Sequence, residues 1–154
     1  MRRFVLYFVA VVHLVIADAV TKEVAAGYLR GRAPVPVVPG FFDLAYVENR
    51  GCAWGMLQGH VWPLAAFAIA AMAFLVWKRE SVFGGGRCAA VAETLLYAGI
   101  AGNLVDRLFR GFVIDFLDFH WKAAYHFPCF NLADAFITVA AGLMVLCSFA
   151  KRTS

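Results

Sequence analysis

The sequence predicts an all-α membrane protein with four transmembrane helices and a small extramembrane β-element on its outer face. Of the 154 residues, 63% are hydrophobic and only 16% are charged, and the mean hydropathy is +0.75. A soluble domain is about 45–50% apolar and about 25% charged. The excess of apolar residues falls into four blocks, at residues 4–21, 61–77, 88–105 and 132–150. Each block is close to the length that crosses a bilayer.

The first block follows Arg2 and Arg3 and, taken alone, has the character of a cleavable signal-peptide core. It continues through Asp18 to Lys22 without a small-x-small cleavage pattern, and three more apolar blocks follow. We therefore expect it to be a retained first span.

The segment between the first two spans, residues 22–60, is expected to be a loop on the outer face. Three prolines and a glycine exclude a continuous helix there, and the apolar residues that follow them alternate with other residues as in a short strand. These residues are Pro34, Pro36, Pro39 and Gly40, followed by Phe42, Leu44 and Tyr46. The second outer-face loop is expected at residues 106–131. Glu93 lies within the third span. We expect it to have a structural partner or to lie near the end of the span, rather than to be catalytic.

Four spans place both termini on one side of the membrane. Half of the basic residues flank the short segments, and the others are spread over the two longer loops. The density near the short segments predicts that both termini face the cytoplasm. The residues beside the short segments are Arg2, Arg3, Lys78, Arg79, Arg87, Lys151 and Arg152.

Charge and cysteine patterns exclude some classes. The net charge is +4, but the basic residues form no stripe, so a nucleic-acid partner is not expected. The four cysteines have no metal-binding spacing, and we expect them to be small apolar packing residues. Pairing of Cys52 with Cys129 requires both to lie outside the membrane and stays open. Without repeats or a linker, residues 1–154 are expected to form one domain.

Polar residues cluster near the last two spans. Asp115 and Asp134 stand at the edges of apolar runs, where an ionised carboxylate is costly. Asn103 and Arg107 are spaced to share one helix face, and so are Asn131 and Asp134. We interpret the site as two carboxyl groups that share a proton, as in an aspartic protease. One would deprotonate a water and the other would protonate the leaving nitrogen.

The residues alone leave two choices open. Asp106 and Asp118 compete with Asp115 as the partner of Asp134. His120 and His126 flank the site, so a divalent metal held by histidine and aspartate is an alternative to direct acid–base chemistry.

Four motifs together resemble the lipoprotein signal peptidase family, also called type II or prolipoprotein signal peptidase. They are DAVTK (18–22), ENRGCAWG (48–55), GIAGNLVDR (99–107) followed by VIDFLDF (113–119), and FNLADAFI (130–137). Each motif is weak by itself, but their order and their coverage of nearly the whole chain make the joint match specific.

The resemblance implies an intramembrane aspartyl endopeptidase of the bacterial inner membrane. Such an enzyme removes signal peptides from diacylglyceryl-modified prolipoproteins by cutting before the lipidated cysteine. The catalytic pair would be Asp115 and Asp134, in a site near the periplasmic face under a β-cradle. The implied substrate-binding or supporting residues are Asn49, Gly99, Asn103, Arg107, Asn131, Ala133, Asp18 and Lys22.

The resemblance also implies no metal and no cofactor, a lipidated prolipoprotein as substrate, membrane lipid as surroundings, and a monomer. Phe41 and Trp54 are candidate anchors of a loop that closes over the peptide.

The alternative is a non-enzymatic small membrane protein, such as a transporter or proton-pathway subunit, whose buried charges form a polar pathway. That alternative does not explain why the polar residues gather beside a β-like loop, which suits an extended peptide.

Overall fold

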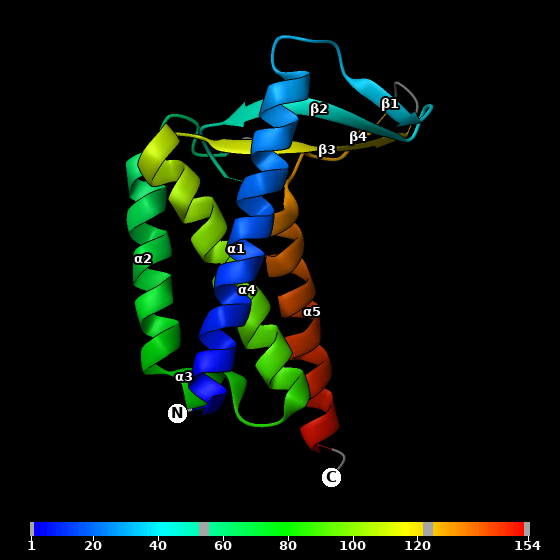
Figure 1. Cartoon of the computed structure of the whole chain (residues 1–154). Helices are drawn as coiled ribbons and strands as arrows, with labels where there is room; N and C mark the ends of the chain where they lie inside the picture. The colour runs from blue at the N-terminus through cyan, green and yellow to red at the C-terminus, as the bar shows by residue number, and fades with distance from the viewer. Residues whose placement is uncertain (1, 53–55, 122–124, 153–154) are drawn as a thin grey trace.

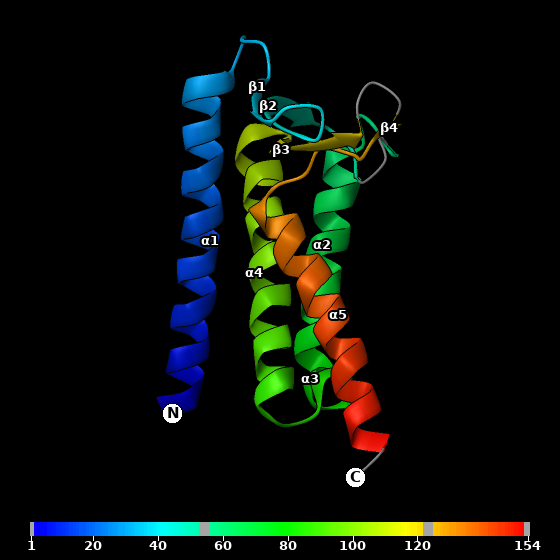
Figure 2. The ribbon, with the colours of Figure 1, turned by 90° about the vertical axis from the view of Figure 1, so that its right-hand side faces the viewer.

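The computed structural model describes residues 2–52, 56–121 and 125–152. Long helices lie side by side, and a small sheet covers one end of them (Figures 1 and 2). Both termini lie at the opposite end (Figure 1). The elements are α1 (Arg2–Leu29), β1 (Val35–Val38), β2 (Phe42–Asn49), α2 (Val61–Trp77), α3 (Arg79–Phe83), α4 (Arg87–Arg110), β3 (Val113–Trp121), β4 (Tyr125–His126) and α5 (Leu132–Arg152).

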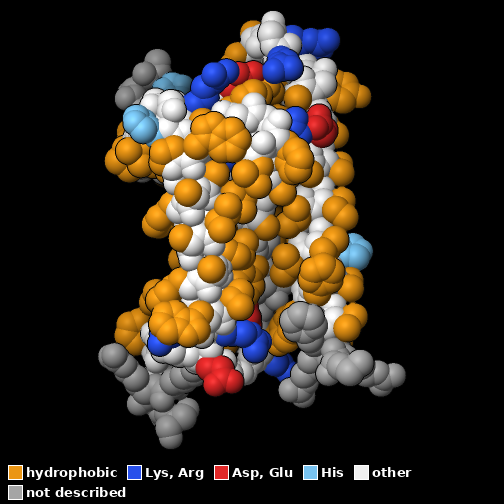
Figure 3. Space-filling view, turned by 90° about the vertical axis from the view of Figure 1, so that its left-hand side faces the viewer, with side chains coloured by type: hydrophobic (Ala, Val, Ile, Leu, Met, Phe, Trp, Pro, Cys, Tyr) orange, Lys and Arg blue, Asp and Glu red, His pale blue; other side chains and the backbone are white. Residues whose placement is uncertain are grey.

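Three helices of the described chain are long and apolar enough to cross a membrane: Val5–Leu29, Arg87–Arg110 and Leu132–Phe149. Hydrophobic side chains cover the middle of the helices, and charged side chains gather towards both ends (Figure 3). The fourth expected span forms an apolar helix at the expected residues 61–77, but it is shorter than the other three. The structure thus confirms a mostly helical membrane architecture with three candidate spans, and it does not confirm the fourth.

Two expected loop boundaries are wrong. Helix α1 continues to Leu29 and α4 continues to Arg110, so the loops predicted to begin at residues 22 and 106 begin later. Hydropathy ended both spans at charged residues. Those charges, among them Lys22 and Asp106, instead form ion pairs inside the molecule and leave the helical backbone intact. Helix α4 then ends at Gly111, whose left-handed backbone (φ 75°) is a common helix terminator.

The expected β-element is a four-stranded sheet with the order β1-β2-β3-β4. Strands β1, β2 and β3 pair antiparallel, with Val47 opposite Asp115 and Asn49 opposite Val113. Half of the sheet comes from the second outer loop, which the sequence did not assign to a strand. The β2–β3 register brings Asn49 and Asp115 to the same region of the sheet.

Helix α4 is the central helix, and it packs against α1, α2 and α5. Gly99 allows its close approach to α5, because a Cβ there would lie 2.5 Å from the Ala133 backbone oxygen. Near the opposite end, a disulfide joins Cys88 of α4 to Cys147 of α5. The expectation that these two cysteines only fill space is therefore wrong, whereas Cys52 and Cys129 are free thiols.

We predict that Gly99→Ala lowers the free energy of unfolding by about 1–3 kcal/mol, the usual cost of overpacking a filled interior. The added methyl group would press on the backbone of α5, which has no side-chain rotation to relieve the contact. Gly142→Ala is the matched control, since a Cβ at Gly142 meets nothing within 4 Å. Thermal unfolding of the two variants in one detergent measures the difference, and equal midpoints would contradict the prediction.

Candidate active site

The first turn of α5 places Asp134. The Asn131 side-chain oxygen accepts a hydrogen bond from the Asp134 backbone N–H at 3.0 Å. In return, the Asp134 carboxylate accepts one from the Asn131 backbone N–H at 3.3 Å. This reciprocal pair is a capping box, and it holds an acidic side chain at the helix N-terminus, where the helix dipole favours it.

Asp115 lies on β3 and is only 2% exposed. One of its carboxylate oxygens accepts a hydrogen bond from the Asn49 amide of β2 at 2.9 Å. The other accepts one from the Asn131 amide at 2.7 Å. Asn131 therefore binds both aspartates, through its side chain to Asp115 and through its backbone N–H to Asp134, and so brings the two carboxyl groups into one site.

Asn103 of α4 supports the pair from below. Its amide nitrogen donates to Asp134 at 2.7 Å. Its amide oxygen accepts from the Asn131 side chain and from the Lys22 ammonium group, each at 3.1 Å. Both polar ends of Asn103 are thus used, which fixes the orientation of its amide.

Lys22 is fully buried, with 0% of its side chain exposed. Its ammonium nitrogen lies 2.7 Å from Asp18 and 2.9 Å from Asp106, in addition to its bond to Asn103. The three donors of the ammonium group are therefore all satisfied. The structure thus pairs Lys22 with Asp18, which lies four residues before it on α1.

The two acidic partners of Lys22 bind further elements. Asp18 accepts a hydrogen bond from the backbone N–H of Ala133 at 2.9 Å, which ties α1 to the start of α5. Asp106 accepts one from the backbone N–H of Ile114 at 3.3 Å and pairs with Arg110 at 2.9 Å. Ala133 itself is completely buried.

These contacts separate the three aspartates that competed as partner of Asp134. Asp106 is held by Lys22 and Arg110. Asp118 lies 3.7 Å from His126 and is 20% exposed. Asp115 is the one that shares Asn131 with Asp134.

Arg107 holds the chain that follows β2. Its guanidinium group donates to the Gly51 backbone oxygen at 3.0 Å and to that of Asn103 at 3.3 Å. The Asn49 side-chain oxygen accepts a hydrogen bond from the Gly51 N–H at 2.9 Å. Arg107 also interacts electrostatically with Asp115 and Asp134. Arg107 therefore binds the loop that follows β2 and also interacts with the two carboxyl groups.

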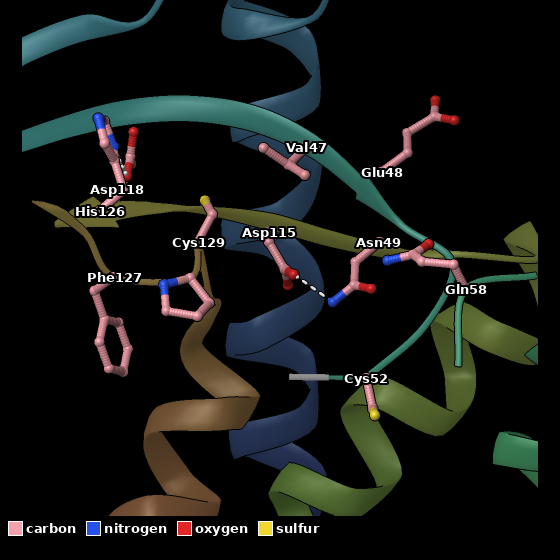
Figure 4. A pocket seen from close by; sticks show the side chains of 11 residues that line it. Val47, Glu48, Asn49, Cys52, Gln58, Asp115, Asp118, His126, Phe127 and Cys129 are labelled. Atoms are coloured by element: carbon pink, nitrogen blue, oxygen red, sulfur yellow. Dashed lines mark hydrogen bonds and ion pairs between the residues drawn. The ribbon is translucent and has the colours of Figure 1, made fainter. Parts of the chain in front are cut away.

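A cavity of about 450 Å³ opens beside Asp115. Figure 4 shows Asp115 and Asn49 joined by their hydrogen bond below β2, with Cys129 and Cys52 on either side. Asp115 lines this cavity although it is buried, whereas Asp134 is half-buried and is not among the lining residues. The lining residues are Val47, Glu48, Asn49, Cys52, Gln58, Asp115, Asp118, His126, Phe127, Pro128 and Cys129.

Burial and the neighbouring Asp134 carboxylate raise the pKa of Asp115 from 3.8 to about 7. The hydrogen bonds from Asn49 and Asn131 act in the opposite direction. Asp115 therefore keeps its proton at a pH where an exposed aspartate has lost it. Burial also raises the pKa of the Cys129 thiol to about 12, so this thiol is not a nucleophile.

The two histidines form a separate cluster in the sheet. The rings of His120 and His126 stack with their centroids 5.1 Å apart. His120 lies 3.3 Å from Asp43, and His126 lies 3.7 Å from Asp118. Among the described residues, no group of three or more His, Cys, Asp or Glu side chains is placed to hold a metal ion.

Of the two expected loop anchors, Phe41 packs on Phe119 in the sheet, with ring centroids 5.7 Å apart, and Trp54 lies outside the described residues.

The structure brings the sequence-predicted site residues together, but Arg110 and Gly102 were missed, and Asp106 takes a different role from the one for which it competed. These three residues complete the surroundings of Lys22 and Asp18: a Cβ at Gly102 would lie 2.7 Å from Asp18. Gly102 directly precedes Asn103, and Asp106 and Arg110 are spaced i,i+4. These were the signals that the sequence offered.

The fold and the site together define a multi-pass membrane protein with a pair of carboxyl groups, one buried and one half-buried, at one end of its helices. Residues 10–150 match the model of the signal peptidase (SPase) II family, and the chain belongs to this family of peptidases. The resemblance seen in the motifs is thereby confirmed.

Relatives and solved structures agree. The lipoprotein signal peptidase of Syntrophotalea carbinolica is 40% identical over 141 residues, which cover 86% of this chain and 84% of that protein. The one of Shewanella loihica is 40% identical over 148 residues, covering 93% and 85%. A bacterial membrane enzyme solved at 2.3 Å resolution superposes with a TM-score of 0.82 at 31% identity, covering 96% of this chain and 89% of that one.

Proposed function

We propose that this chain is an intramembrane aspartyl endopeptidase that removes signal peptides from diacylglyceryl-modified prolipoproteins, cutting before the lipidated cysteine. The observation that carries the proposal is that one asparagine, Asn131, binds both Asp115 and Asp134, while Asp115 retains a proton near neutral pH. Names of the relatives support the substrate class.

In the proposed reaction, a water molecule attacks the scissile carbonyl carbon while Asp134 takes one proton from the water. Asp134 already accepts N–H bonds from Asn103 and Asn131 that suit an anionic carboxylate. Asp115 gives its proton to the carbonyl oxygen, which yields a gem-diol. As the C–N bond breaks, Asp134 passes the proton from the water to the leaving nitrogen, and Asp115 takes a proton back from a hydroxyl of the gem-diol. The pair ends with one proton between its two carboxyl groups, as it began.

The location of the site suits a lipidated substrate. Each methylene group that stays in lipid or apolar protein is worth about 0.8 kcal/mol, so extracting two acyl chains into water is prohibitive. A site at the end of the helices lets the chains remain in the bilayer while the peptide backbone reaches Asp115. The cavity between β2 and residues 126–129 would hold the extended peptide, and Asn49 lies at its wall.

The proposed topology has four spans, with α2 as the short one. Both termini would be cytoplasmic, and the sheet and site would lie near the periplasmic face of the inner membrane, in a monomer whose 154 residues form one domain. The termini lie at the end of the helices opposite the sheet (Figure 1), and Lys78, Arg79 and Arg87 lie close to α3 at that same end. Basic residues near short loops favour the cytoplasmic side.

We predict that Asp115→Asn and Asp134→Asn each reduce cleavage of a lipidated prolipoprotein peptide by at least about a thousandfold, since asparagine can neither hold nor transfer the proton. Asp118→Asn is the matched control, because Asp118 lies on the same strand and lines the same cavity. It should keep most of its activity. If Asp118→Asn were inactive while Asp115→Asn stayed active, the assignment of the catalytic residue on β3 to Asp115 would be wrong.

The pH profile should fall on the alkaline side. Asp115 is protonated below its pKa of about 7 and loses its proton as the pH rises through that value. The pair then lacks the proton that it must donate, so kcat/KM should decrease about tenfold for each pH unit above about 7. A rate that stays constant up to pH 9 would show that Asp115 is not the acid.

The lipid requirement is a separate test. The same peptide without its diacylglyceryl group should be cleaved at least about ten times less efficiently, because acyl-chain binding energy concentrates the peptide at the membrane edge. The comparison uses kcat/KM of both peptides in one detergent. Equal values would leave a peptidase without lipid selectivity.

A further inference from the structure

A second cavity of about 640 Å³ lies at the end of the helices opposite the sheet. It is larger than the cavity beside Asp115 and shares no residue with it. Its walls come from the first turns of α1, the last turn of α2, the glycine turn before α4 and the first half of α4. Helices α1 and α2 both pack on α4, and the cavity lies between them. This size is typical of a site for a small molecule.

One part of the wall is apolar and another is polar. Phe8 and Val11 of α1 and Val76 of α2 line the apolar part, and Arg79, Glu93 and Tyr97 line the polar part. The cavity therefore matches a ligand that has one apolar part and one polar part.

The polar part has hydrogen-bonding capacity left over. Arg79 binds both oxygens of Glu93, through Nε at 2.5 Å and Nη2 at 2.8 Å. Among the described residues, its third nitrogen, Nη1, has no hydrogen-bond partner. The Tyr97 hydroxyl group is buried and also has none among them. A buried hydroxyl without a partner is unfavourable, so a polar ligand group that bonds to it would stabilise the complex.

The Arg79–Glu93 pair also explains why a glutamate is tolerated inside the third expected span. Glu93 is only 9% exposed and is neutralised by Arg79, whose side chain is 51% exposed. The exposed part of the Arg79 guanidinium group therefore offers N–H donors at the surface of the cavity. Lys78 and Arg87 lie close by in the chain and are exposed, against one exposed carboxylate at Glu80, so the surroundings of the opening carry a net positive charge that favours an anion.

We propose that this cavity binds one anionic phospholipid, with its phosphate on Arg79 and Tyr97 and an acyl chain between α1 and α2. Phosphate oxygens accept strong hydrogen bonds from guanidinium nitrogens. The apolar wall gains free energy for each methylene group that it covers. A peptide segment fits this wall less well, because its backbone would place unpaired N–H and C=O groups against Phe8, Val11 and Val76. Free phosphate would leave the apolar wall uncovered.

The test is native mass spectrometry of the purified full chain in detergent. The probes are palmitoyl-oleoyl phosphatidylglycerol, the corresponding diacylglycerol without a phosphate, and inorganic phosphate. We expect one phosphatidylglycerol to be retained per chain, diacylglycerol to be retained at least about tenfold less, and inorganic phosphate not to be retained.

Two variants probe the cavity. Ala90→Leu fills it from α4, and Tyr97→Phe removes the buried hydroxyl group while preserving the ring. Each should lower phosphatidylglycerol retention about tenfold. Arg87→Gln is the control, because Arg87 is an exposed cation at the same end that does not line the cavity, and its retention should be unchanged. Arg79 is left intact, since its removal would leave Glu93 buried without a partner.

Equal retention of diacylglycerol and phosphatidylglycerol, retention unaffected by Ala90→Leu, or an equal loss with Arg87→Gln would each overturn the proposal. Cleavage of the lipidated peptide serves as the folding check, because neither test residue lines the cavity beside Asp115. A chain that retains the phospholipid but cleaves nothing would count against the proposed peptidase function and not against this site.

Discussion

The buried ammonium group of Lys22 is the interaction on which the rest of the structure depends. Placing one cation and two carboxylates out of water costs several kcal/mol per ion unless every charge is paired. The pairing requires three elements at once, because Lys22 and Asp18 come from α1, Asp106 comes from α4, and Asp18 also binds the first turn of α5. Asp106 adds β3 through Ile114. The charge cluster is therefore satisfied only when the helices and the sheet take their native relative positions.

Asparagine amides connect this cluster to the carboxyl pair. Asn103 accepts from Lys22 and donates to Asp134, and Asn131 donates to Asp115 and to Asn103. An amide has a fixed donor end and a fixed acceptor end, so each bond determines the orientation of the next. The pair thus receives its geometry from hydrogen bonds that are complete before any substrate binds. Preorganised donors of this kind do not have to reorganise during the reaction.

Sequence reasoning worked where local chemistry decides and failed where distant partners decide. The apolar blocks identified the helices, and the spacing of Asn131 and Asp134 anticipated a shared helix face, which the capping box explains. The end of α1 was misplaced because hydropathy treats Lys22 as a surface charge, although its partner Asp106 is far away in the chain. Strand β3 was missed because its apolar residues do not alternate regularly, and its pairing with β2 joins segments that α2 and α4 separate. The family motifs were also needed to choose Asp115 over Asp106 and Asp118, because the contacts that distinguish these residues join distant parts of the chain.

The arrangement of polar groups also bears on the alternative of a proton or solute pathway. Within the described residues, the buried polar side chains form two groups at opposite ends of the helices, one around Lys22 and one around Glu93. On α4, the stretch between Glu93 and Asn103 includes Ala98 and Gly99, which are buried, and Gly99 packs directly on the α5 backbone. A conducting pathway needs polar groups or water along its whole length, since hydrocarbon surroundings strongly disfavour charge. A packed apolar layer between two separate polar ends instead suits a protein whose chemistry takes place at one membrane surface.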